Sequence, residues 1–147
     1  MTAVASTRTQ ARELTLQALY MRECGGEPGE KFENVLDEEG GERSNLSYAQ
    51  YLYRLAIEHE IWADEQISAL AQNWELARIA VVDRIVLRMA LVEMVYGDNI
   101  PPKVVMNEAI ELAKRFSTPQ SPGFVNGLLD GYAKLRTERP DRASEEK

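Results

Sequence analysis

The chain has 147 residues, a formal net charge of −7 and a globular composition, with 44% hydrophobic and 28% charged residues. Its single cysteine, Cys24, excludes an internal disulfide and a cysteine-built metal site, and one unpaired thiol fits a reducing compartment. The most apolar stretch, residues 79–96, carries four charged residues, and the start of the chain lacks the apolar core of a signal peptide. We therefore expect a soluble cytoplasmic protein that does not enter the membrane.

Acidic residues are concentrated in one part of the chain. Residues 1–24 carry three basic and two acidic side chains, for a net +1, whereas residues 25–65 carry three basic and eleven acidic ones, for a net −8. The overall charge repels nucleic acid at long range, but a small basic patch still attracts phosphates within a Debye length of about 10 Å. The net charge therefore does not exclude a nucleic-acid partner.

The first half of the chain shows helical periodicity. Apolar residues recur on one face of residues 6–22, and Gly25-Gly26 ends that segment. A short helix is expected at residues 31–39. Residues 46–74 repeat the pattern over 29 residues, which is long for one globular helix, so we expect a bend near Ala63-Asp64.

The second half predicts three more helices. Residues 79–96 are apolar on most sides, as in a helix at the middle of a bundle, and residues 104–116, which follow two prolines, carry one apolar face. The last helix is expected at residues 121–135, with Ser121 as its N-cap and a proline next. Residues 136–147 are charged and are expected to be disordered. Since no strand pattern occurs, the sequence predicts an all-α fold.

Patterns for catalysis and metal binding are weak. The one histidine, His59, is flanked by glutamates whose side chains, at i ± 1 on a helix, point away from its face. The sequence has no Gly-x-Ser-x-Gly elbow and no glycine-rich phosphate loop after a strand. We therefore expect no catalytic residue, no metal and no cofactor.

Two arginines near the start of the first predicted helix form a candidate phosphate-binding pair. Arg8 and Arg12 are four residues apart, so on a helix they share one face at a spacing of about 6 Å. Thr9 and Gln10 lie beside them and can hydrogen-bond phosphate or base edges. From spacing alone, two ordinary surface arginines at a helix start are the favoured interpretation.

Several blocks of the sequence together resemble the bacterial NusB family of transcription antitermination factors. They appear in family order and cover residues 11 to about 135. The blocks are residues 11–13, 17–20, 83–90, 102–104, 107–114 and 124–130. The resemblance implies about seven helices in two small packed bundles, residues 6–62 and 63–135, within one domain spanning residues 1–135.

The resemblance also implies a function. Members of the family bind boxA-type single-stranded RNA together with the ribosomal protein NusE, join RNA polymerase and support ribosomal RNA transcription without catalysis of their own. A similar helical fold occurs beside the catalytic domain of ribosomal RNA cytosine methyltransferases, and a mainly dimerising structural protein is a third interpretation. Self-association as a homodimer is left open.

The family's RNA-facing surface is implied to combine the first helix with the start of the last one. It would consist of Arg8, Thr9, Gln10, Arg12, Phe124 and Asn126. On one shared surface, Arg12 would contact a phosphate and Phe124 would stack on a base, while Gly127 would let a neighbouring helix approach. For Phe124, Asn126 and Gly127, the alternative is that they only pack the last helix against the first. The chain also carries fewer arginines in its first helix than many members of the family, which implies greater dependence on NusE.

The partner surface is implied to lie on residues 79–116, with Asp83 and Arg84 as the candidates for contact with NusE. Asp83 is a charge on an otherwise apolar helix, and a basic residue of the partner could pair with it. The alternative is an acid in the first helical turn, where the helix dipole favours it by about 0.3–1 kcal/mol.

Overall fold

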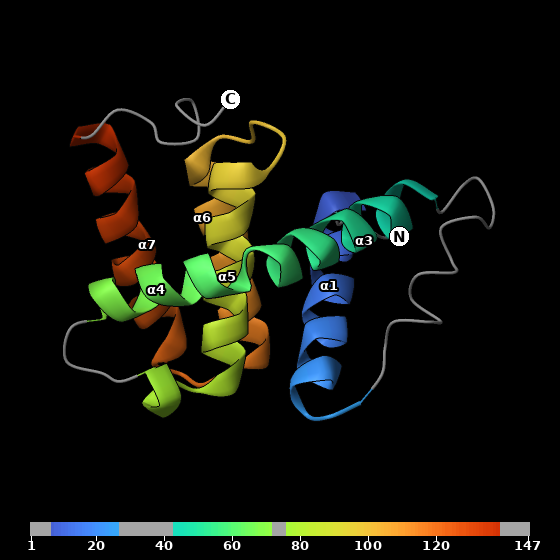
Figure 1. Ribbon diagram of the computed structural model, residues 1–147, viewed down its shortest axis with the longest axis horizontal. Coiled ribbons are helices and arrows are strands. Elements are labelled where there is room, and N and C mark those ends of the chain that lie inside the picture. The colour runs from blue at the N-terminus through green and yellow to red at the C-terminus, as the bar shows by residue number, and fades with distance from the viewer. Residues whose placement is uncertain (1–6, 27–42, 72–75, 139–147) are drawn as a thin grey trace. The chain divides into compact units, whose positions relative to one another are not determined.

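The computed structural model describes residues 7–26, 43–71 and 76–138 of the chain (Figure 1). These residues form six α-helices and one 3-10 turn and contain no strand, which confirms the all-α class. The chain divides into two compact units, Met1–Glu58 (unit 1) and His59–Lys147 (unit 2). The sequence places this division four residues later, and the short helix expected at residues 31–39 lies outside the described residues.

Unit 1 is built on the contact between α1 (Thr7–Glu23) and α3 (Arg43–Glu58). Small side chains lie between the two helices at a seven-residue spacing, and all are buried: Ala11, Ala18, Ala49 and Ala56. The hydroxyl of Thr15, also buried, lies 3.0 Å from the carbonyl oxygen of Ala49 on the facing helix and 2.9 Å from that of Ala11 on its own. The alanines allow a close approach, and the backbone carbonyls satisfy the buried hydroxyl of Thr15.

The long periodic segment of the sequence is two helices. The long segment is interrupted, but not at the predicted position: α3 ends at Glu58 and α4 (Glu60–Leu70) follows, with the interruption at His59 (φ −111°, ψ 25°). Ala63, near the predicted bend, is fully buried inside α4. The His59 ring stacks on Tyr96, with the ring centres 3.7 Å apart, and this long-range contact is invisible to helical periodicity.

Unit 2 is organised around α5 (Val81–Tyr96), as its apolar sequence predicts. α4, α6 (Pro102–Phe116) and α7 (Ser121–Glu138) all contact α5 (Figure 1), and every residue from 85 to 94 is buried. The short turn η2 (Leu76–Arg78) precedes α5. A helix surrounded in this way needs apolar residues on all sides.

One charge inside α5 has its partners on α4. Arg88 donates through Nε to Oδ1 of Asp64 at 2.7 Å and through a terminal nitrogen to Oδ2 at 3.0 Å, and its other terminal nitrogen lies 3.4 Å from Glu60. The planar guanidinium matches a carboxylate in this two-point geometry, so a buried arginine is tolerated here. The pairing joins α4 to α5.

The helix ends of unit 2 follow local rules. Gly97 caps α5, and a Cβ at this position would lie 2.4 Å from the carbonyl oxygen of Glu93, so no larger residue fits without a shift. The proline start of α6 is confirmed at Pro102. α7 continues to Glu138, so residues 136–138 are helical and not disordered as expected, while residues 139–147 lie outside the described part. No helix among the described residues is long and apolar enough to cross a membrane.

Candidate nucleic-acid interface

In unit 1 the two predicted phosphate-binding arginines share one aromatic ring. The guanidinium carbon of Arg8 lies 3.8 Å from the ring centre of Tyr48 on α3, and that of Arg12 lies 6.0 Å from it. Both distances fall within the range of cation–π attraction. Tyr48 was not among the predicted site residues. A tyrosine on the apolar face of a helix does not reveal in the sequence which cations contact its ring.

The two arginines differ in exposure. Arg8 is exposed, whereas Arg12 is only 4% exposed. Gln10 is exposed and Thr9 is half-buried. Among the predicted α1 residues, Arg8 is therefore better placed than Arg12 to meet a phosphate in solution, and Tyr48 orients its guanidinium.

In unit 2 a hydrogen-bond network holds the start of α7. Ser117 donates to Oδ1 of Asp83 at 2.7 Å, and Ser121 donates to Oδ2 of the same carboxylate at 2.9 Å. The hydroxyl of Thr118 lies 2.8 Å from that of Ser121. One buried carboxylate on α5 thus fixes the connection between α6 and α7 through hydrogen bonds to a charged acceptor, which are stronger than neutral ones.

The cap of α7 differs from the one expected. Ser121 is already the first helical residue, and its Oγ accepts a hydrogen bond from the backbone N–H of Thr118 at 3.2 Å. This hydrogen bond ties the loop before α7 to the first residue of the helix. The prediction of Ser121 as the N-cap is wrong, because the helix already begins at this residue. Its hydroxyl hydrogen-bonds to the preceding loop and to Asp83.

A cavity of about 220 Å³ opens beside this network, and Phe124 and Asp83 both line it. The other lining residues come from η2, the start of α5 and the start of α7: Arg78, Ile79, Ala80, Thr118, Gln120 and Ser121. Phe124 is half-buried, so part of its ring remains accessible. The structure thus brings a predicted RNA-binding residue and a predicted NusE-binding residue to one cavity.

Two residues of the family block that follow Phe124 lie on the solvent side of α7. Asn126 and Gly127 are both exposed, and a Cβ at Gly127 would meet nothing within 4 Å. The idea that Gly127 admits a neighbouring helix is therefore wrong, because no atom lies close enough to need the missing side chain. Packing does not explain this glycine within α7.

Asp83 and Arg84 have limited surface to offer a partner. Asp83 is 6% exposed and both its carboxylate oxygens accept serine hydroxyls, while Arg84 is half-buried. A direct salt bridge from Asp83 to another protein would have to replace internal hydrogen bonds. Arg12 and Phe124 belong to different units, so their common surface stays a prediction.

Metal chemistry finds no support in the described residues: they contain no group of three or more histidine, cysteine, aspartate or glutamate side chains placed to hold an ion. What the two sites offer is a cation over an aromatic ring in unit 1 and a half-buried ring beside a cavity in unit 2. Such groups bind and orient a ligand by charge and stacking.

Comparison with known proteins places the chain in a family. Residues 9–134 match the NusB family. The transcription antitermination protein NusB of Bacillus velezensis is 47% identical over 83% of this chain and 92% of its own length, and that of Geobacter sulfurreducens is 44% identical over 86% and 93%. A chain in the crystal structure of antitermination factors NusB and NusE in complex with double-stranded RNA superposes with a TM-score of 0.72 at 26% identity, covering 88% of this chain and 97% of that one. The chain belongs to the NusB family.

Proposed function

We propose that this chain is a transcription antitermination factor that binds boxA-type single-stranded RNA together with NusE and supports ribosomal RNA transcription. Within this role it joins an RNA polymerase complex in the cytoplasm and carries out no catalysis. The observation that carries the proposal is the half-buried ring of Phe124 in the lining of a cavity that a cation, Arg78, also lines, in a chain of the NusB family.

Two contact types support RNA as the ligand. Phe124 offers a ring face on which an unpaired base can stack, a contact worth about 1–3 kcal/mol. Arg8 offers an exposed guanidinium held over Tyr48, suited to a phosphate. A single strand fits the ring better than a duplex does, because the bases of a duplex already stack on each other.

The proposal is tested by fluorescence titration of labelled single-stranded boxA RNA, with the duplex form as a comparison, across a series of salt concentrations and with or without NusE. Phe124→Ala should weaken binding by about 1–3 kcal/mol at all ionic strengths. Arg8→Ala should instead flatten the salt dependence by about 0.7 units, the amount expected for one phosphate of a single strand. NusE should raise the affinity, because the chain's own charge of −7 is repulsive.

Leu135→Ala and Lys103→Ala are the matched controls, since both residues are exposed and lie away from the cavity at the start of α7. Thermal melts run beside the titrations separate binding from folding. Arg12→Ala is expected to lower the melting temperature as well as the affinity, because Arg12 is buried. A parent protein that binds the duplex as tightly as the single strand, or a Phe124→Ala protein that binds like the parent, would contradict the proposal.

Contact with NusE through Asp83 and Arg84 is a finer part of the proposal. Asp83→Asn keeps the shape of the side chain but removes its charge, so a salt bridge to the partner would be lost while much of the internal network survives. If Asp83→Asn pairs with NusE as the parent does, the contact lies elsewhere on unit 2. The oligomeric state of the free chain, measured by sedimentation, decides whether it also forms a homodimer.

A further inference from the structure

At one end of unit 2, α5 and α7 begin and α6 ends. This end presents exposed apolar side chains in addition to the cavity. We name this region, residues 76–84 and 114–124, the Asp83 end; Figure 1 shows these helix ends together on one side of the unit. Phe116, the last residue of α6, is 40% exposed, and Val81 is 37% exposed. With Phe124 they place three apolar side chains around the Asp83 network.

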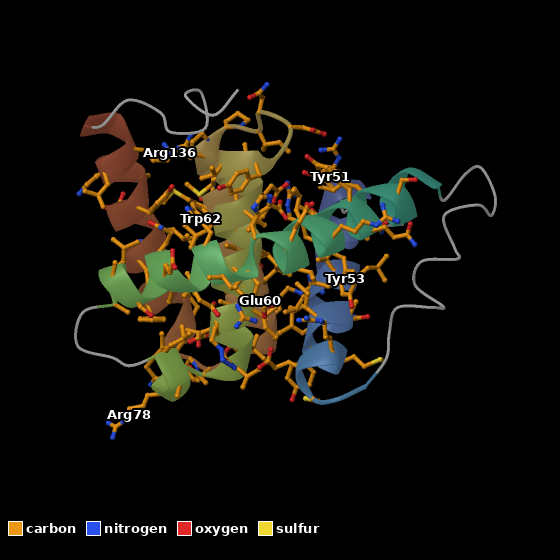
Figure 2. All side chains as sticks on the ribbon, viewed as in Figure 1. Tyr51, Tyr53, Glu60, Trp62, Arg78 and Arg136 are labelled. Atoms are coloured by element: carbon orange, nitrogen blue, oxygen red, sulfur yellow. The ribbon has the colours of Figure 1, made fainter. Side chains whose placement is uncertain are left out.

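Basic side chains surround these apolar ones. Lys114, Arg115 and Arg78 are all exposed, and Figure 2 shows Arg78 projecting outward from η2, away from the helices. The acidic residues nearest to these cations in the sequence are Glu75, which lies outside the described residues, Asp83, which is buried and accepts two serine hydroxyls, and Glu111, one turn earlier on α6. The Asp83 end is therefore locally basic in a chain whose net charge is −7.

The guanidinium of Arg115 and the ring of Phe116 lie side by side. The guanidinium carbon of Arg115 lies 5.0 Å from the centre of the Phe116 ring, within cation–π range. Bases of single-stranded RNA stack both on aromatic rings and on arginine planes. An exposed ring beside a guanidinium thus offers two stacking surfaces and a positive charge for the neighbouring phosphate.

The Asp83 network connects this pair to Phe124. Ser117 directly follows Phe116, and its hydroxyl lies 3.0 Å from that of Ser121, which stands one turn before Phe124. Because Asp83 holds both serines, the end of α6 and the start of α7 are fixed with respect to each other. A strand that reaches Phe124 would need to cross only this short connection to reach Phe116.

We propose that Arg115 and Phe116 form a second stacking site for single-stranded RNA, adjoining the Phe124 cavity, with Arg78 and Lys114 contacting the flanking phosphates. This inference rests on the proposed function and extends its surface over the end of α6. Much of the positive charge that contacts RNA would then lie on unit 2 and not on α1. The charge pattern favours a polyanion over a protein partner, since three exposed cations surround the apolar side chains.

The test is the titration of labelled single-stranded boxA RNA with Phe116→Ala, Phe116→Leu and Arg115→Ala. Phe116→Ala is expected to weaken binding by about 5- to 150-fold with an unchanged salt slope. Phe116→Leu keeps an apolar side chain and the fold but lacks the ring, so it should lose much of the same affinity. Arg115→Ala should flatten the salt slope by about 0.7 units, and Arg115→Lys should restore the slope.

Two control variants match the changes in exposure and charge. Leu135, 45% exposed on α7, matches Phe116, and Lys103, exposed at the opposite end of α6, matches Arg115. Leu135→Ala should leave RNA affinity unchanged, and Lys103→Ala should leave the salt slope unchanged. Equal effects of Lys103→Ala and Arg115→Ala would overturn the inference, because they would reveal a general effect of net charge.

The remaining outcomes separate the inference from the proposed function. If the parent binds no RNA with or without NusE, both fail. If Phe124→Ala loses RNA affinity while both Phe116 variants bind like the parent, the proposed function stands and the second site is refuted. If the Phe116 variants bind RNA normally but no longer pair with NusE, the surface belongs to a protein partner and the inference is wrong.

Discussion

The two ends of the helices in unit 2 are held by different means. At the Asp83 end, side chains fix the loop between α6 and α7 through a carboxylate and serine hydroxyls. At the opposite end, residues 94–103 and 132–136, here named the Gly97 end, steric limits act on the backbone at Gly97 and Asn99. Gly97 closes α5 where a Cβ would collide with the Glu93 carbonyl, and Asn99 adopts a positive φ of 59°.

A side chain also binds the backbone at the Gly97 end, because Arg136 donates to the carbonyl oxygen of Met94 at 3.1 Å. Arg136 and Met94 help to line a cavity of about 460 Å³ there, and Figure 2 shows Arg136 at this end and Arg78 at the other. This difference predicts which kind of substitution should destabilise each end. The Asp83 end should be sensitive to the chemistry of a side chain, and the Gly97 end to its size.

The largest expected effect is at the Asp83 end. Asp83→Ala removes a charged acceptor from two hydroxyls, so the free energy of unfolding should fall by about 2–3 kcal/mol. Urea denaturation measures it, and Asp83→Asn should lose less because one oxygen still accepts. In a double-mutant cycle with Ser121→Ala the losses should not add, since both changes break the same network. Additive losses would mean that the network does not hold this end together.

The Gly97 end should respond to size. Gly97→Ala places a methyl group 2.4 Å from the Glu93 carbonyl oxygen, and relieving that collision should cost about 2 kcal/mol of unfolding free energy. Thermal and urea melts are the measurements. A Gly97→Ala protein as stable as the parent would show that this end can shift, which would remove the contrast between the two ends.

Gly127 tests this contrast further, because no contact among the described residues requires a glycine at this position. Its added Cβ would meet nothing within 4 Å in the middle of α7, so Gly127→Ala should stabilise the protein by about 0.5–1 kcal/mol. The same melts compare it with Gly97→Ala, and the two changes should have opposite signs. A loss of stability would indicate an undetected contact, whereas a gain accompanied by weaker RNA binding would give this glycine a functional reason.

The smallest effect is expected for an exposed ion pair on α7. Lys134 lies 3.2 Å from Asp130 with side chains 74% and 51% exposed, so Lys134→Ala should change the unfolding free energy by less than about 0.5 kcal/mol. This variant measures how little a surface charge contributes. A change as large as that of Asp83→Ala would contradict the distinction between buried and exposed carboxylates in unit 2.

The sequence by itself determined most of the helices and their ends. Apolar periodicity located α1, α5, α6 and α7, the all-round apolar character of α5 placed it at the middle of its unit, and glycine and proline marked the end of α5 and the start of α6. These features depend on residues within about one helical turn of each other, which is the range over which a sequence pattern is informative. Helical spacing selected Arg8 and Arg12, and the family resemblance selected Asp83, Arg84, Phe124 and Asn126.

Only the tertiary structure decided what those candidates contact. Asp83 meets serines 34 and 38 residues away, Arg88 meets Asp64 at a separation of 24, and Arg12 is buried although its spacing suits a surface pair. Phe116 falls on the apolar face of α6 in the sequence, where burial was the natural expectation, but the residue is 40% exposed. A local pattern fixes which face of a helix is apolar, but which parts of that face are covered depends on where distant helices end.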